Sequence, residues 1–462
     1  MSKINVICRR NLLYRFHNGL LVILLMSFWL MFHILSFNTF NKQAQRDAVD
    51  ENVNLSNAII LSMVPQAYHK YLVSKIKNTT SPSRAATNVS SSKTPFQQVL
   101  SINEIQRRID EYNKLQTVLN EDIFGPLQND SLVIVIQVHN RLMYLRHTII
   151  SLAQAEGIEN ALLVFSHDYY DEEINSIIQS IDFCKVMQIF YPYSIQTHPN
   201  EFPGESKNDC PRNINIKEAV ERKCTNALHP DLYGHYREAK FTQTKHHWWW
   251  KANRVFNGLN ITKNYTGLVV FFEEDHYVAQ DFIHMLHLME HARQSACPNC
   301  KILSLGSYLK SVDFAADSKK AEIMQWSSSK HNMGMAFNRS VWKELKSCAK
   351  TFCTYDDYNW DWSLLAVSSK CLSKELTAMV LRAPRVFHIG ECGVHHKNSC
   401  KSTQTLRRVQ KLLVTSTAYL YPQDLYLTYT VTKKYLKKAK GNGGWGDIRD
   451  HNLCLKMVDR SR

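Results

Sequence analysis

A run of four residues near the middle of the chain carries the densest group of reactive side chains. Glu273, Glu274 and Asp275 are consecutive carboxylates, and His276 follows them. Adjacent like charges repel unless something neutralises them, and a divalent cation that prefers oxygen ligands, such as Mg²⁺ or Mn²⁺, does this well. Such a metal could hold the diphosphate of a nucleotide and stabilise charge on it as a leaving group. The alternative is a solvated acidic turn.

The apolar run before these residues indicates which carboxylates act together. Leu268–Phe272 are all apolar, as in a buried strand, whose successive side chains point to opposite faces. All three carboxylates therefore cannot bind one ion equally. Asp275 is the best metal candidate, Glu273 shares its side and could meet a substrate hydroxyl, and Glu274 points away.

Two other apolar runs also end in polar residues, "QVHNR" at Gln137–Arg141 and "SHD" at Ser166–Asp168. Ligands of an open parallel sheet bind outside the carboxyl ends of its strands, so we expect these segments and Glu273–His276 to form one site. The chain has no G-x-G-x-x-G after a strand and no P-loop, G-x-S-x-G or H-E-x-x-H motif. Dehydrogenase, P-loop, esterase and zincin chemistry are therefore unsupported.

Strands and helices that alternate along the chain would position these segments. Apolar runs predict strands over 131–138, 161–170, 185–193, 267–275 and 301–308, and amphipathic patterns predict helices over 141–157, 171–181 and 280–294. This order predicts a doubly wound, mostly parallel α/β sheet. A helix near 102–115 has an apolar face, which suits an oligomerising coil or, as we favour, packing on the domain.

The N-terminal region predicts a membrane anchor. Residues 19–37 are free of Asp, Glu, Lys and Arg and are long enough to cross a bilayer, with Arg9, Arg10 and Arg15 before them. The positive-inside rule makes 1–18 a cytosolic tail and places the rest in the lumen; a cleaved signal peptide is the alternative. Residues 38–100 are polar and Ser/Thr-rich, as in a stem, and 101–462 form the lumenal catalytic domain. Sequons beyond the span agree: Asn54, Asn78, Asn88, Asn129, Asn260, Asn264 and Asn338.

Charge and cysteine content restrict the partners and the compartment. The net charge is +15, but the basic residues are scattered, which argues against nucleic acid and suits anionic partners such as nucleotide sugars. Cys8 precedes the predicted span and eleven cysteines follow it. Disulfides are expected in a lumen, and an odd number leaves one thiol unpaired, for which Cys184 is the candidate. "CPNC" at Cys297–Cys300 could instead be half a zinc site, although no second pair at zinc-finger spacing accompanies it.

Several motifs, in this order, resemble glycosyltransferase family 16: "QVHNR", "FSHD", "QTKHHWWWK", "EEDHY", "HNMG", "TYDDYNWDWS" and "HIGECGVHHK". The resemblance runs from about Ile102 to the C-terminus. It implies a Golgi type II membrane protein with a GT-A fold. It also implies inverting transfer of GlcNAc from UDP-GlcNAc to O2 of the α1,6-linked mannose of an N-glycan, with Mn²⁺ as cofactor. The alternatives are a related transferase with another acceptor, such as the α1,3-arm mannose, and an inactive lectin-like binder.

The same resemblance assigns roles to individual residues. Asp275 and His388 become the metal ligands, and Asp168 is suited to accept from the uracil N–H. The donor- and substrate-binding positions become Gln137, Val138, His139, Asn140, Arg141, Asp168, Gln243, Thr244, Lys245, His246, His247 and Glu273. Lys245 and the two histidines after it would reach toward a diphosphate or sugar.

Inverting transfer needs a carboxylate base on the face opposite the leaving group. "TYDDYNWDWS" offers Asp356, Asp357 and Asp361, and the resemblance makes Asp361 the base. Trp360 and Trp362 would give it a dry setting and surfaces for sugar stacking, while the other two aspartates hold the loop.

The resemblance also implies disulfides and reveals departures from the family. The implied pairs are Cys210–Cys224, Cys297–Cys300, Cys348–Cys371, Cys353–Cys454 and Cys392–Cys400, with Cys184 free. Val312 stands where the family tends to carry an Arg associated with substrate contact. Leu142 and Met143 replace a usual Pro-Glu pair at a helix start, a change that we expect to be tolerated.

Overall fold

The computed structural model describes residues 64–72, 100–308, 311–391, 404–430 and 441–459. Most of them belong to one compact unit, Ala67–Arg462. The predicted span at residues 19–37 lies outside the described residues. Within the ranges that are described, no helix is long and apolar enough to cross a membrane.

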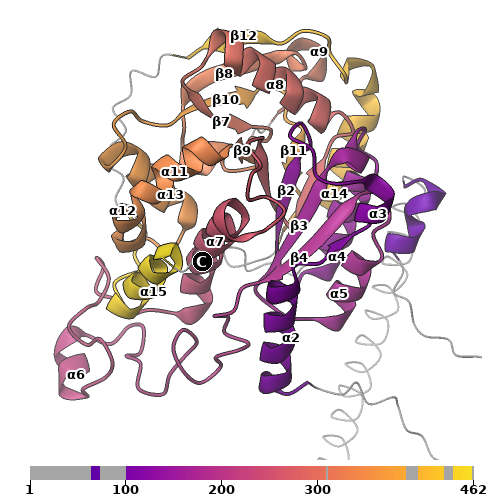
Figure 1. The fold of residues 1–462 in the computed structure, drawn as a ribbon. Helices are drawn as coiled ribbons and strands as arrows, with labels where there is room; N and C mark the ends of the chain where they lie inside the picture. Colours follow the sequence, from indigo (N-terminus) through magenta and orange to yellow (C-terminus); the bar gives the residue numbers. More distant parts are fainter. Residues whose placement is uncertain (1–63, 73–99, 309–310, 392–403, 431–440, 460–462) are drawn as a thin grey trace, which may run out of the picture. The chain divides into compact units, whose positions relative to one another are not determined.

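The strands form one large sheet and one small ribbon (Figure 1). The order in the large sheet is β1-β4-β3-β2-β5-β9-β7-β10-β8-β12, and β6 pairs with β11 in the ribbon. The bounds are β1 Val118–Leu119, β2 Val133–Val138, β3 Leu162–His167, β4 Lys185–Phe190, β5 Val269–Glu273, β6 His276–Val278, β7 Cys300–Ser304, β8 Lys320–Gln325, β9 Met335–Phe337, β10 Thr377–Leu381, β11 Val386–His388 and β12 Tyr426–Tyr429.

The helices connect these strands. Their bounds are η1 Gln66–Tyr71, α2 Ile102–Leu115, α3 Glu121–Phe124, α4 Leu142–Ala153, η2 Ile158–Asn160, α5 Glu172–Gln179, α6 Ile216–Glu221, α7 Ala239–Asn253, η3 Arg254–Gly258, α8 Phe282–Ala296, α9 Phe314–Asp317, α10 Ser328–His331, α11 Arg339–Ser347, α12 Ala349–Thr354, α13 Trp360–Lys370, α14 Gln404–Thr415, η4 Thr417–Tyr419 and α15 Ile448–Asp459.

The parallel core of the sheet confirms the predicted α/β arrangement. Strands β4, β3, β2 and β5 run parallel to one another, whereas β9 is antiparallel to both β5 and β7. Gln137 at the end of β2 is level with Ser166 of β3 and with Glu273 of β5. The three polar strand ends identified in the sequence therefore lie side by side.

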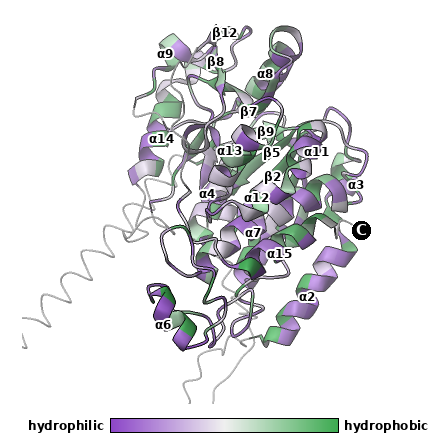
Figure 2. Ribbon diagram, turned by 90° about the vertical axis from the view of Figure 1, so that its left-hand side faces the viewer, coloured by the Kyte–Doolittle hydropathy of each residue, from purple (hydrophilic) through white to green (hydrophobic). Residues whose placement is uncertain are grey.

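One face of the sheet packs on an aromatic core. Val133 and Val135 of β2 belong to a buried cluster that includes Trp248 and Trp249 of α7 and Trp342 of α11. Figure 1 shows α4 and α5 on the side of β2–β4 away from α7. Helices on both faces explain why β2 and β3 are apolar without alternation. Figure 2 shows the hydrophobic colouring of the central strands, for example of β2 and β5.

Helix α2 is a packed helix, as the favoured interpretation predicts. Ile105 and Ile109 are buried against Tyr170 and Phe190. Ser101 caps the helix by accepting a hydrogen bond from the backbone N–H of Glu104. The apolar stripe of α2 is thus used within the domain.

Four of the five implied disulfides are present: Cys210–Cys224, Cys297–Cys300, Cys348–Cys371 and Cys353–Cys454. Cys184 is free and buried, as predicted. "CPNC" is therefore a disulfide turn rather than half a zinc site. The pair Cys392–Cys400 lies outside the described residues.

A short segment within the range predicted to be stem contacts the domain. The Tyr71 ring is buried, and its hydroxyl donates to Asp182 Oδ1 at 2.8 Å. Arg146 Nη1 donates to the Tyr71 carbonyl at 2.8 Å, and Lys70 pairs with Asp182. Composition alone gave no sign of this contact, because one aromatic residue carries most of it.

We predict that Tyr71→Ala lowers the free energy of unfolding by about 3 kcal/mol or more, because a buried aromatic ring is removed. Tyr71→Phe keeps the ring and loses one hydrogen bond, so the expected loss is about 1 kcal/mol. Urea unfolding of the full chain, followed by tryptophan fluorescence, measures both. Equal midpoints for Tyr71→Ala and the unsubstituted protein would show that this contact does not stabilise the domain.

Candidate active site

Arg141 is the cation that neutralises two of the three consecutive carboxylates. Its Nε donates to Glu274 Oε1 and its Nη1 to Asp275 Oδ2, each at 2.6 Å. Glu274 is fully buried and also accepts from the backbone N–H of His139 at 2.7 Å. Strand alternation does not separate Glu274 from Asp275 as predicted, because β5 ends at Glu273 and both residues lie in the turn after it, where they share the Arg141 guanidinium. Through the His139 N–H, Glu274 ties the loop after β2 to the end of β5.

Asp275 is buried and ionised. Burial alone would raise its pKa, but the hydrogen bond from His388 and the charges of His388 and Arg141 hold that pKa well below its usual range. Its Oδ1 is buried and has no hydrogen-bond partner within the described part of the chain. Gly390 allows this arrangement, because a Cβ there would lie 2.1 Å from Asp275 Oδ2.

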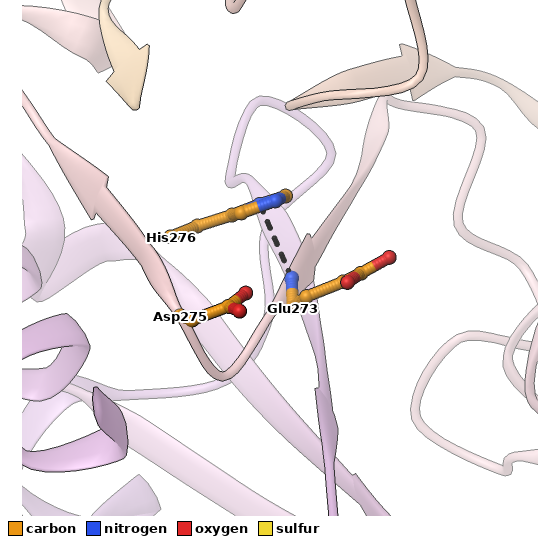
Figure 3. Close-up of side chains that lie close together, drawn as sticks. All are labelled: Glu273, Asp275 and His276. Atoms are coloured by element: carbon orange, nitrogen blue, oxygen red, sulfur yellow. Dashed lines mark hydrogen bonds between the residues drawn. The ribbon is translucent and has the colours of Figure 1, made fainter. Parts of the chain in front are cut away.

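Two histidines flank Asp275 on the β6–β11 ribbon, where His276 and His388 are paired in register. His388 Nε2 lies 3.2 Å from Asp275 Oδ2. Burial would lower the pKa of His388, but the hydrogen bond and charge of Asp275 outweigh it and raise the pKa. His276 Nδ1 accepts from the backbone N–H of Glu273 at 3.2 Å, the dashed line in Figure 3.

This arrangement fits a divalent cation. Potential ligand atoms of Glu273, Asp275 and His276 all lie within 4.8 Å of one another, and Asp275 Oδ1 is unsatisfied. A neutral imidazole that accepts at Nδ1 carries its proton on Nε2, so His276 has no free lone pair for a metal. His388 Nε2 faces Asp275 and can bind a metal once it has lost its proton, so His388 is the better imidazole ligand, beside the oxygens of Asp275 and Glu273.

A second carboxylate lies at the end of β3. Asp168 is buried, with Oδ1 at 2.6 Å from His139 Nδ1 and Oδ2 at 3.4 Å from His247 Nδ1. Burial would raise its pKa, but the two histidines hold the pKa well below its usual range. Asn140 is exposed beside this group, and Val138 is buried, with its carbonyl accepting from the Asp168 N–H.

Lys251 is a site residue that the sequence analysis missed. It is buried, and its Nζ donates to Gln137 Oε1 at 2.6 Å. Burial lowers the pKa of Lys251 to about 7, although the charges of Glu273 and Asp168 oppose this. The only signal in the sequence was a single charged residue directly after three tryptophans, in a helix otherwise suited to the core.

The segment Gln243–His247 does not act as one binding surface. Lys245 is fully buried and donates to the carbonyls of Tyr355 and Asp357, so it does not reach toward the strand ends as predicted. His246 pairs with Asp450 at 2.9 Å. Gln243 accepts a hydrogen bond from the Ile195 N–H, and Thr244 is half-buried. Within this segment, only His247 contacts the strand-end groups, which are Ser166 and Asp168. Helical geometry turns neighbouring residues about 100° apart, which separates these contacts.

Asp361 lies in the first turn of α13 and is 9% exposed. Its oxygens accept from the Trp362 N–H at 3.0 Å and from Asn332 Nδ2 at 3.2 Å. Burial raises the pKa of Asp361 to about 7, and the charges of Asp357 and Glu273 add to this. A carboxylate in this setting can accept a proton near neutral pH.

The aromatic residues around Asp361 differ in role from the prediction. Trp360 is buried and stacks on Trp248 with centroids 4.5 Å apart, so it belongs to the core and offers no sugar-stacking surface. Trp362 is half-buried beside the same cluster.

Asp356 and Asp357 hold the loop before α13, as predicted. They accept hydrogen bonds from the backbone N–H groups of Leu232, Trp445, Asn359 and Asn442.

A protein-family model described as N-acetylglucosaminyltransferase II (MGAT2) matches residues 106–454, about three quarters of the chain. The chain belongs to this family. The match covers the carboxylate cluster, α7 and α13.

Curated relatives agree, and five of them share the name alpha-1,6-mannosyl-glycoprotein 2-beta-N-acetylglucosaminyltransferase. That of Rattus norvegicus is 47% identical over 73% of this chain and 77% of its own length. The Homo sapiens protein is 46% identical over 73% and 76%, and the Arabidopsis thaliana protein 37% over 74% and 78%. A crystal structure of S. aureus TarS 1-349 covers 72% of this chain and 71% of its own, but the TM-score of 0.29 and the 9% identity are too low to support an argument.

Tyr308 and Asn332 also lie at this family member's site, although the sequence analysis gave them no role. Tyr308 is 53% exposed, and its ring is 6.4 Å from that of His388. Partial desolvation and the charges of Glu273 and Asp361 raise the pKa of Tyr308. Val312, the departure from the family pattern, is half-buried and follows it in the chain.

We predict that Glu274→Gln lowers the free energy of unfolding by about 1–3 kcal/mol. The amide would leave a buried donor unsatisfied, either Arg141 Nε or the His139 N–H, and would remove the charge that Arg141 faces. Urea unfolding at pH 7.5 measures the effect. Glu205→Gln is the control, because Glu205 is exposed and its change should stay within about 0.5 kcal/mol; equal losses for both variants would contradict the role of Glu274.

Proposed function

We propose that this protein transfers GlcNAc from UDP-GlcNAc to O2 of the α1,6-arm mannose of N-glycans, with inversion, to form a β1,2 linkage. The observation that carries the proposal is a pair of carboxylate groups in one site whose pKa values are moved in opposite directions. Asp275 is held ionised beside His388, and Asp361 has a pKa of about 7. The names of the relatives supply the sugar and the acceptor arm.

The donor would bind along the ends of β2, β3 and β5. Gln137–Arg141 form the loop after β2, and Asp168 follows β3. Lys251 places an amine at the same edge, held by Gln137, and the charge of a bound diphosphate would favour its protonated form. These groups give the edge both hydrogen-bonding capacity for a uracil and ribose and cationic groups for a diphosphate.

Asp361 would act as the general base. In a single in-line displacement, its carboxylate removes the proton from the mannose O2 hydroxyl as that oxygen attacks the anomeric carbon of GlcNAc. The bond from that carbon to the UDP oxygen breaks, and UDP leaves with the electron pair. Asn332 orients the Asp361 carboxylate by donating to Oδ2.

Asp275 and His388, with Glu273 close by, would hold a Mn²⁺ ion. When bound, the ion would neutralise charge on the diphosphate leaving group. Glu273 is half-buried and points to the same side as Asp275, so it could instead meet a substrate hydroxyl.

We also propose a GT-A fold and a Golgi membrane protein of type II, with 1–18 cytosolic, 19–37 spanning the membrane and the catalytic part lumenal. The mostly parallel sheet with ligand groups at its carboxyl ends supports the fold. The apolar segment, the basic residues before it and the sequons after it support the topology. Protease treatment of sealed microsomes tests this topology, since digestion of a C-terminal epitope in intact vesicles would contradict it.

We predict that the full chain in detergent, with UDP-GlcNAc and MnCl₂, adds one GlcNAc to an N-glycan that already carries GlcNAc on its α1,3 arm. Linkage analysis should place it β1,2 on the α1,6-arm mannose, and EDTA should abolish transfer. No addition to this glycan, with transfer to the α1,3-arm mannose of a glycan that lacks GlcNAc on both arms, would establish the related transferase instead. Glycan binding without any transfer would establish the lectin-like alternative.

We predict that Asp361→Asn lowers kcat by at least about 10²-fold, because the proton acceptor is lost, while UDP affinity is unchanged. In the unsubstituted enzyme the base must be ionised, so transfer should fall about tenfold per unit as pH drops below about 7 and level off above it. If Asp361 had the pKa of an ordinary aspartate, the fall in transfer would begin near pH 4 instead. Asp424→Asn, at an exposed position, is the control; unchanged transfer by Asp361→Asn would exclude Asp361 as the base.

A further inference from the structure

Helix α7 contacts the segment that carries Asp361 at two points on one of its faces. The first is Lys245, whose Nζ donates to the carbonyls of Tyr355 and Asp357, each at 3.0 Å. The same Nζ lies 4.1 Å from the centroid of the Trp445 ring. Two of its three N–H donors are used by these carbonyls, and the side chain is fully buried, so Lys245 does not face substrate.

The second point is Trp248, three residues along α7 and therefore on the same face. Its ring stacks on that of Trp360 with centroids 4.5 Å apart and planes inclined by 1°. Trp360 is the residue immediately before Asp361 and begins α13. Lys245 and Trp248 thus hold the segment Tyr355–Trp360, which leads directly into Asp361.

Another face of α7 contacts the donor edge of the sheet. His247 hydrogen-bonds Ser166 Oγ at 2.8 Å and lies 3.4 Å from Asp168, while Lys251, four residues on, donates to Gln137. A helix is stiff over the six residues from Lys245 to Lys251. A displacement reaction needs this stiffness, because the attacking and reacting atoms must be aligned at about 3–3.5 Å. One rigid element therefore spans the groups that would bind the donor and the segment that carries the base.

We propose that Lys245 and Trp248 are positioning residues that hold Asp361 in place relative to the donor site through helix α7. This inference rests on the proposed function, in which Asp361 is the base. It gives Lys245 a role within the protein rather than on the substrate, and it explains why a fully buried lysine in the "QTKHHWWWK" motif faces backbone carbonyls.

The test replaces Lys245 by Met, which keeps the length of the side chain and removes its donors. In the full chain, Lys245→Met should lower kcat about tenfold to hundredfold. KM for UDP-GlcNAc and the affinity for UDP should be unchanged, because His247 and Lys251 still contact the donor edge. Hydrogen–deuterium exchange should be faster at the amides of residues 359–363 and unchanged at β2 and β3.

Trp248→Phe provides a milder variant that keeps the inference testable if Lys245→Met does not fold, and it should change kcat and exchange in the same direction. Lys240→Met is the control, since Lys240 is exposed on the same helix with a side-chain exposure of 61%. Unchanged kcat, unchanged exchange at 359–363, or a donor KM that rises as kcat falls would overturn the inference. Absence of transfer by the unsubstituted enzyme would instead overturn the proposed function, while the exchange measurement would still decide the role of α7.

Discussion

The contact of Arg141 with two adjacent buried carboxylates is the interaction on which the site depends. Glu274 and Asp275 are both fully buried, and two such charges in a medium of low dielectric would be costly without an opposite charge. The planar guanidinium meets one acid through Nε and the other through Nη1. A lysine, with a single charged centre, could not match both in this way. The same contact joins the loop after β2 to the end of β5, so it also sets the geometry of the donor edge.

The three carboxylates at the end of β5 and in the turn after it have different partners. Glu274 points toward Arg141 and the His139 N–H, where it serves the fold. Asp275 shares Arg141 with Glu274 and also faces His388, which the short ribbon β6–β11 places beside it. A residue that looks redundant in the sequence is thus the structural support for its two neighbours.

Helix α7 shows how one motif can serve several purposes. Its polar residues contact Tyr355 and Asp357, then Asp450, then Ser166 and Asp168, and finally Gln137 as the helix turns. Its tryptophans fill the core below the sheet. The helix therefore contributes to stability, to the donor edge and to the setting of Asp361 without presenting a continuous binding surface.

The sequence by itself determined the alternation of strands and helices, the three polar strand ends that meet and the existence of an unpaired Cys184. These features follow from local periodicity and from chain order in a parallel sheet, both of which are written in short segments. Its resemblance to a family added four disulfides that the structure contains and named Asp275, His388 and Asp361. The tertiary structure alone decided that Arg141 neutralises Glu274, that Lys251 lies at the donor edge, and that Lys245 and Trp360 are turned inward. Those contacts join residues far apart in the chain, which for Arg141 and Glu274 means 133 positions. Burial of these side chains then shifts their pKa values. No local sequence pattern encodes which distant residue a buried side chain will contact, or how far its surroundings will exclude water.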